Sequence, residues 1–384
     1  FLGSLPMMWT TDEKSTKSSL GLKKEVIGAG PTFSNRGLTR KTITKEPQNL
    51  LPIVAEWTGQ RAPGIPLVGR RGQLAFWSPF DGCFVPGKRM YNTEGNYNFC
   101  ITGKSGSGKS FLCNEIIENT LSVGGKAFVI DRGDSMKNLC EFRGGTHVSF
   151  DLSKPFSVNP FTHIPEGNSE DEQEDRAALF VGLQKIVMAM AFQDGQKDKT
   201  GYLNEAIQTI WKTEGSKGSI DSIADLLARN PDPRAKDIAR CLLNFTSEGQ
   251  YGQFFNPPAN IDISSDFVVF ETAKMTNDLK GVLLMMMMVR VWQRMIASDR
   301  NAPFLILIDE AKILLDGKES SAFISDVARN ARKYRCALGL ATQSLKDFFG
   351  GDNKGSEDVW ENSSWKVVLQ QEPDTISGLK SHEH

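Results

Sequence analysis

The chain has 384 residues, of which 39% are hydrophobic, so it is long enough to bury one large core or two ordinary ones. Its 45 Lys and Arg residues balance 46 Asp and Glu residues, which excludes a global field that favours nucleic acid or an anionic membrane surface. The six cysteines lack C-x-x-C spacing, and no apolar run approaches the roughly 20 residues of a membrane span, so neither a zinc site nor a transmembrane segment is expected.

The first part of the chain differs from the rest in amino-acid composition and in apolar periodicity. Residues 1–48 are rich in Ser, Thr, Lys and Gly with little apolar periodicity, which predicts a linker or the tail of a missing N-terminal domain. The chain begins with Phe1, so we expect it to be a portion of a longer protein. Short strand and turn patterns follow at 51–57, 69–77 and 78–80.

A phosphate-binding loop follows the next strand pattern, at 98–102. Residues 103–110 read Gly-Lys-Ser-Gly-Ser-Gly-Lys-Ser, a complete G-x-x-x-x-G-K-[ST] motif, and an amphipathic helix pattern begins at Phe111. Glycines let the backbone approach a polyphosphate closely, and the N-terminus of a helix favours an anion. Lys109 is predicted to reach the β- and γ-phosphates and Ser110 to ligate Mg²⁺. The residues predicted to bind the nucleotide are Gly103, Ser105, Gly106, Ser107, Gly108, Lys109, Ser110 and Phe111. A glycine-rich turn without a ligand is the alternative, which the flanking strand and helix disfavour.

The middle of the chain changes from strand to helix patterns. Residues 126–131 form a second buried strand pattern, and strand-helix-strand is the unit of a parallel sheet. Between 165 and 255 the pattern is helical, with helices expected from a Ser169–Glu172 capping box to Phe192 and over 202–213, 221–229 and 234–247. We therefore predict an all-helical insertion at 165–255 between two parts of one core, 49–164 and 256–384.

Strand and helix patterns alternate again after the insertion. They predict strands at 266–271, 304–308, 337–341 and near 365–369, with helices over about 277–298 and 319–333. The Met285 to Met288 tetrad is interpreted as the core of a buried helix and not as a partner-binding surface. The fold class is α/β with a mostly parallel central sheet.

Polar residues with complementary chemistry end two of these strands. The strand at 304–308 delivers Asp309 and Glu310 to the edge where parallel sheets bind ligands. Asp309 is expected to hold Mg²⁺ through its water shell, and Glu310 to polarise the water that attacks the γ-phosphate. Gln343, at the tip of the strand at 337–341, is predicted to sense the γ-phosphate and this water. A surface acidic pair and a polar turn residue are the alternatives.

Other charged residues allow two interpretations each. The helix before the strand at 337–341 carries Arg329 and Arg332, which are candidates for an arginine finger offered to a neighbouring subunit or belong to a solvated face. Asp131, Arg132 and Glu271 end further strands and contact either the nucleotide or a subunit interface, or are ordinary strand-terminating residues.

A family resemblance rests on the order of several motifs. The chain resembles the TraC-type ATPases of conjugative type IV secretion systems over roughly residues 50–370. The segments that carry the resemblance are 309–315, 327–334 and 341–344 with Asp347-Phe348, and upstream 51–57, 69–73, 96–98, 131–135 and 159–161. Lys312 departs from the Trp expected after Asp-Glu-Ala.

The resemblance implies a RecA-like P-loop NTPase core of the HerA/FtsK group, with ATP and Mg²⁺ as cofactors. It implies a homo-oligomer, expected to be a hexamer, peripheral to the cytoplasmic face of the bacterial inner membrane. Inner-membrane secretion components and pilin are the implied partners, and hydrolysis would energise pilus assembly and substrate transfer.

Two other functions stay open. An FtsK-like DNA pump is disfavoured by the near-zero net charge, although residues 14–45 are basic, so contact with DNA is left undecided. A nucleotide-gated scaffold with little turnover would leave Glu310 and Gln343 as spectators.

Overall fold

A computed structural model gives the fold of the chain. It describes residues 59–60, 64–69, 72–80, 96–150, 156–162, 164, 170–191, 200–275, 277–296, 302–349 and 354–372. The segment predicted to be a linker, 1–48, and the strand pattern at 51–57 lie outside the described residues.

The centre of the molecule is a seven-stranded sheet in which every pair of neighbours is parallel. The strand order is β5-β6-β4-β7-β8-β3-β9. The bounds are β3 Phe99–Thr102, β4 Lys126–Asp131, β5 Thr146–Ser149, β6 Phe267–Glu271, β7 Phe304–Ile308, β8 Cys336–Thr342 and β9 Trp365–Val368. A separate antiparallel pair comprises β1 Ile65–Val68 and β2 Leu74–Trp77. The predicted α/β class with a parallel sheet is confirmed.

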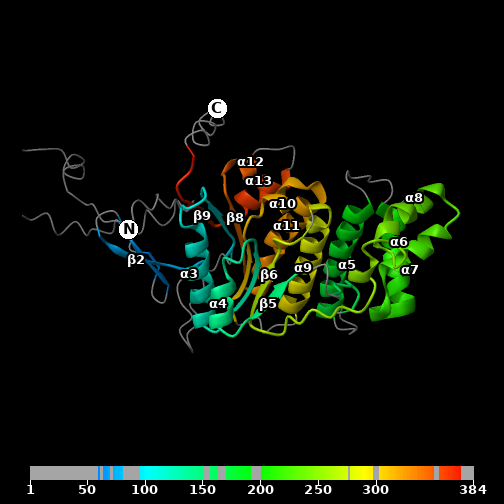
Figure 1. The fold of residues 1–384 in the computed structure, drawn as a ribbon, viewed down its shortest axis with the longest axis horizontal. Helices are drawn as coiled ribbons and strands as arrows, with labels where there is room; N and C mark the ends of the chain where they lie inside the picture. Colours follow the sequence, from blue (N-terminus) through cyan, green and yellow to red (C-terminus); the bar gives the residue numbers. More distant parts are fainter. Residues whose placement is uncertain are drawn as a thin grey trace, which may run out of the picture.

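Helices cover both faces of this sheet (Figure 1). The helices outside the β5–β6 connection are α3 Lys109–Ser122, α4 Lys137–Phe142, α9 Asn277–Ile296, α10 Lys312–Asp316, α11 Lys318–Ala331, α12 Lys346–Phe349 and α13 Lys354–Glu361. Alternate residues of β4 belong to two hydrophobic cores: Ala127 and Val129 pack with α3, whereas Phe128 and Ile130 pack with α9 and α11. The central strands are therefore apolar on both faces.

The predicted helical segment lies between the neighbouring strands β5 and β6. It comprises α5 Glu170–Ala191, α6 Thr200–Glu214, α7 Ile220–Ala228 and α8 Pro233–Leu242. Capping explains two of the starts, because Ser219 accepts a hydrogen bond from the Ser222 N–H and Asp232 accepts one from Arg234 N–H. The helix expected over 234–247 ends earlier and continues as a 3₁₀ turn at 243–245. In Figure 1, α5 packs beside α9, and α6 to α8 lie farther from the sheet. That 165–255 forms a domain of its own stays a prediction.

Some local elements were missing from the sequence prediction. β5 is a four-residue edge strand whose side chains are partly exposed, so it carries no apolar run that would identify it. The Met285 to Met288 tetrad of α9 is buried, as expected for a core helix. No helix in the described part of the chain is long and apolar enough to cross a membrane.

Candidate nucleotide-binding site

The phosphate-binding loop leaves β3 at the carboxyl edge of the sheet and enters α3 at Lys109. Gly106 and Gly108 adopt left-handed φ angles of 76° and 93°, which residues with a side chain rarely adopt. A Cβ built on either glycine would point into open space. At Gly103, a Cβ would lie 2.4 Å from the Ser107 Oγ and 2.8 Å from the Leu369 Cβ, so only glycine fits there.

Backbone contacts hold the start of this loop in place. The Gly103 N–H donates to the Thr342 carbonyl at 3.2 Å, and the Lys104 N–H donates to the Gln370 carbonyl at 2.9 Å. The buried Ser107 Oγ has no hydrogen-bond partner among the described residues. An open cradle, an orphaned hydroxyl and the N-terminus of α3 together fit a polyphosphate.

The phosphate loop and the acidic pair meet at one place. The Lys109 Nζ lies 3.6 Å from the Asp309 Oδ1, and the two side chains are 12% and 7% exposed. Burial raises the pKa of the Asp309 carboxyl, an effect that the neighbouring Lys109 ammonium opposes. Ser110 follows Lys109 in the first turn of α3, and its role as an Mg²⁺ ligand together with Asp309 stays a prediction.

Glu310 stands beside Asp309 in a strained conformation. Its φ angle is 59°, a left-handed value that is uncommon for a residue other than glycine. The Gln343 Nε2 donates a hydrogen bond to the Glu310 Oε1 at 3.3 Å. The Arg132 guanidinium lies 2.7 Å from the Glu310 Oε2. β8 lies between β7 and β3, which explains how Gln343 faces both the acidic pair and the phosphate loop.

Glu271 has a structural role in the described contacts. Its carboxylate accepts hydrogen bonds from the N–H groups of Gly133 at 3.2 Å, Asp134 at 2.7 Å and Ala273 at 2.6 Å. The loop after β4 is thus tied to the end of β6. Glu271 therefore anchors this loop, and its contact with the nucleotide or a subunit interface stays a prediction.

Asp131 is fully buried at the end of β4. One carboxylate oxygen accepts a hydrogen bond from the Met136 N–H at 2.8 Å, whereas the other has no partner among the described residues. Burial, with smaller contributions from Glu271 and Asp309, raises the pKa of this carboxyl from 3.8 to about 6.

This shift predicts a pH-dependent stability. Because ionisation of Asp131 is less favourable in the folded chain than in the unfolded chain, raising the pH from below 4 to above 6 lowers the free energy of unfolding by at most about 3 kcal/mol. An Asp131→Asn variant without Mg²⁺ or nucleotide should therefore gain stability relative to the wild type as the pH rises from 4.5 to 8. Thermal denaturation at both pH values gives the stability of the variant minus that of the wild type, and a value that falls as the pH rises would contradict the prediction.

Arg329 and Arg332 are not at the carboxyl edge of their own sheet. They lie where α11 and the following 3₁₀ turn lead into the amino end of β8. The seven residues of β8 separate that end from Gln343 by roughly 20 Å, at about 3.3 Å per residue. Arg329 pairs with Asp358 at 2.8 Å, and Arg332 is exposed. The structure therefore does not bring either arginine to the phosphate loop of the same chain.

Phe111 is the third residue of α3 and is 67% exposed. Ser105, also exposed, lies at the outer bend of the loop.

The sequence did not predict the pairing of Arg132 with Glu310, because the two residues are 178 positions apart and only the order of the strands makes them neighbours.

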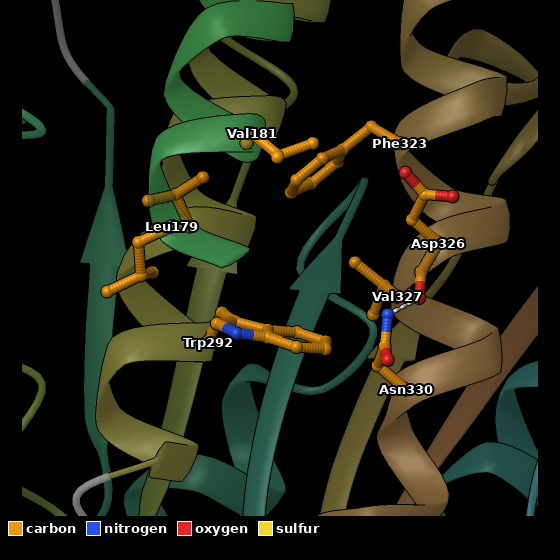
Figure 2. A pocket seen from close by; sticks show the side chains of 9 residues that line it. Leu179, Val181, Trp292, Phe323, Asp326, Val327 and Asn330 are labelled. Carbon is orange, nitrogen blue, oxygen red and sulfur yellow. Dashed lines mark hydrogen bonds between the residues drawn. The ribbon is translucent and has the colours of Figure 1, made fainter. Parts of the chain in front are cut away.

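A groove elsewhere in the molecule has a different chemistry. Figure 2 shows the side chains of α5, α9 and α11 that line it, with Val181 and Phe323 close together above the Trp292 ring. Its lining is mostly apolar, and Asp326 is its one charged residue. Such a lining has no groups suited to a triphosphate, so the groove is separate from the nucleotide site.

Comparison with known proteins agrees with this site. The family model of the TraG P-loop domain matches residues 83–374. Protein TraC of Escherichia coli strain K12 is 28% identical over 354 residues, which cover 87% of this chain and 38% of TraC. The conjugal transfer protein TrbE of Rhizobium radiobacter is 23% identical, over 83% of this chain and 37% of TrbE. The chain thus spans less than two fifths of these curated relatives.

Solved structures show the same fold. The structure of VirB4 of Thermoanaerobacter pseudethanolicus matches with a TM-score of 0.67 and 19% identity, over 86% of this chain and 90% of the solved chain. The bacterial conjugative coupling protein TrwBdeltaN70 matches with a TM-score of 0.52 and 14% identity, over 74% of this chain and 73% of the solved chain. TrwB in complex with ADP and Mg²⁺ matches with a TM-score of 0.50 and 13% identity, over 84% of this chain and 76% of that chain. The expected P-loop NTPase fold and the resemblance to TraC-type proteins are confirmed, and the chain belongs to the TraG P-loop domain family.

Proposed function

We propose that this domain binds and hydrolyses Mg-ATP. The observation that carries the proposal is the convergence of Lys109, Asp309, Glu310 and Gln343 at the carboxyl edge of one sheet. TrwB, which shares the fold, has been solved with ADP and Mg²⁺. The orphaned Ser107 hydroxyl and the open glycine cradle support a phosphate ligand here.

Each residue has a role that follows from its position. The loop N–H groups and Lys109 bind the phosphates, and Ser110 and Asp309 hold Mg²⁺, which when bound neutralises charge on the β- and γ-phosphates. Glu310 accepts a proton from the attacking water, and Gln343 orients that water through the amide that now contacts Glu310.

The cellular role follows from the relatives. TrbE is a conjugal transfer protein by name, and together with the similarity to protein TraC this supports a motor of a conjugative type IV secretion system. We propose that it works as a homo-hexamer, peripheral to the cytoplasmic face of the inner membrane, and that it contacts inner-membrane secretion components and pilin. Hydrolysis then energises pilus assembly and substrate transfer.

An arginine supplied by the neighbouring subunit completes this proposal. Arg329 and Arg332 precede the amino end of β8, and the length of this strand, roughly 20 Å, separates that end from Gln343, so the proposal needs another copy to supply either arginine. Arg332 is the better candidate, because Arg329 is engaged by Asp358. In a ring, such a residue stabilises charge that develops at the γ-phosphate of the next subunit.

The test is phosphate release by the purified protein with ATP, in the presence and absence of Mg²⁺. We expect turnover that depends on Mg²⁺. We also expect the Ser110→Ala variant to lose most of this Mg²⁺-dependent turnover, because the mutation removes a proposed metal ligand. Wild-type turnover no faster than that of a Glu310→Gln variant would favour the nucleotide-gated scaffold. Strong stimulation by double-stranded DNA would favour the DNA pump.

A further inference from the structure

An arginine at the end of a neighbouring strand forms an ion pair with the proposed catalytic glutamate. Arg132 directly follows β4, which pairs with β7, and its Nη1 lies 2.7 Å from the Glu310 Oε2. The other carboxylate oxygen of Glu310 accepts the hydrogen bond from Gln343. Both oxygens of the glutamate are thus held, each by a different strand.

The backbone of Glu310 is fixed independently of these contacts. Its N–H donates to the Asp309 Oδ1 at 3.0 Å, and the next N–H, of Ala311, donates to the Ala341 carbonyl at 2.9 Å. Together with the left-handed φ angle, these bonds set where the side chain begins. The position of the Glu310 carboxylate depends on the side-chain rotamer. The charge-assisted contact with Arg132 is the strongest contact that favours one rotamer.

The loop that carries Arg132 is anchored on both sides. Before it, the buried Asp131 accepts the Met136 N–H, and after it, Glu271 accepts the N–H groups of Gly133 and Asp134. Two buried carboxylates therefore set the backbone around one arginine. The Arg132 side chain is 46% exposed and that of Glu310 is 25% exposed, so the anchored backbone helps to hold this ion pair in one geometry.

A second buried cation belongs to the same electrostatic environment. Lys280, in the first turn of α9, is 5% exposed, and burial lowers the pKa of its ammonium, an effect to which Arg132 adds and which Glu310 and Glu271 oppose. A cation in the first turn of a helix opposes the helix dipole, and burial adds a further cost. Its placement is explained if it balances the two carboxylates and keeps Arg132 directed toward Glu310.

We propose that Arg132 is a positioning residue for hydrolysis, which holds the Glu310 Oε2 so that the Oε1 faces the attacking water once Gln343 turns toward the γ-phosphate. This rests on the proposed ATPase function. Arg132 acts through Glu310 and not on the nucleotide, so its loss should slow the chemical step without weakening ATP binding.

The test compares Arg132→Gln, Arg132→Lys and the matched control Arg143→Gln in steady-state ATP hydrolysis. Arg143 pairs with Glu118 between α3 and α4, away from the site. We expect Arg132→Gln to lower kcat about 10- to 100-fold, with KM and the Kd of a non-hydrolysable ATP analogue within about twofold of wild type. Lys should restore part of kcat, and Arg143→Gln should match wild type.

A double-mutant cycle separates positioning from a structural role. In a Glu310→Gln background, Arg132→Gln should cause no further loss of turnover, because the group it positions is already gone. Unchanged kcat in Arg132→Gln, a parallel rise in KM, or losses that multiply in the double variant would each overturn the proposal. If Arg132→Gln does not fold, Arg132→Lys takes its place in the test. An Arg132→Lys variant with the melting temperature and the kcat of the wild type would then overturn the proposal. Wild-type protein without Mg²⁺-dependent turnover would overturn the ATPase function itself.

Discussion

Replacing Glu310 by Gln should lower the rate of ATP hydrolysis at least about 100-fold while ATP binding is retained, because general-base catalysis contributes about 10²- to 10⁴-fold. The amide has the shape of the carboxylate but cannot accept the proton of the attacking water. Lys109 and Asp309, which we propose bind the phosphates and the metal, are left intact. The chemical step and not binding should therefore carry the loss.

Single-turnover phosphate release with saturating enzyme measures this effect directly, and a fluorescent ATP analogue measures affinity. Glu118→Gln serves as the control, because Glu118 pairs with Arg143 on the surface between α3 and α4. Turnover within a fewfold of wild type in Glu310→Gln would remove this residue from catalysis. A large fall in affinity would instead place its carboxylate on the nucleotide.

Replacing Lys109 by Ala should reduce affinity for Mg-ATP about 100-fold, which corresponds to about 2.7 kcal/mol. The ammonium is the charged group of the loop that lies closest to the metal ligand Asp309, and charge-assisted contacts to phosphate are among the strong ones. Its removal also leaves the buried Asp309 without its cation, so this pKa should rise further and favour a protonated acid that binds metal poorly.

Isothermal titration with ADP and with Mg-ADP separates these two effects. Lys126→Ala is the matched control, since Lys126 starts β4 at the opposite edge of the sheet and pairs with Asp266. If affinity for ADP without metal falls while the gain from Mg²⁺ is unchanged, Lys109 acts on phosphate alone. Equal affinity in Lys109→Ala and wild type would contradict the assignment of this loop as the phosphate site.

Much of the fold was predictable from local patterns. The strands at 126–131 and 304–308 were predicted with the bounds that the structure has, because both are continuous apolar runs, as buried parallel strands require. The phosphate loop was predictable because its glycines and Lys109 form one contiguous motif of the sequence. Short elements with mixed polarity, such as β5 and α4, carried no comparable signal.

The sequence by itself determined the phosphate-loop motif, the acidic pair and the parallel sheet, since these depend on patterns among residues close together in the chain. Only the tertiary structure decided which strands are neighbours. The order β4-β7-β8-β3 brings Arg132 to Glu310, Gln343 to the same carboxylate and Lys109 to Asp309. The same order makes Glu271 an anchor of the Arg132 loop. The pairing of buried strands depends on how all their side chains pack into two cores at once, which no single segment of the chain encodes.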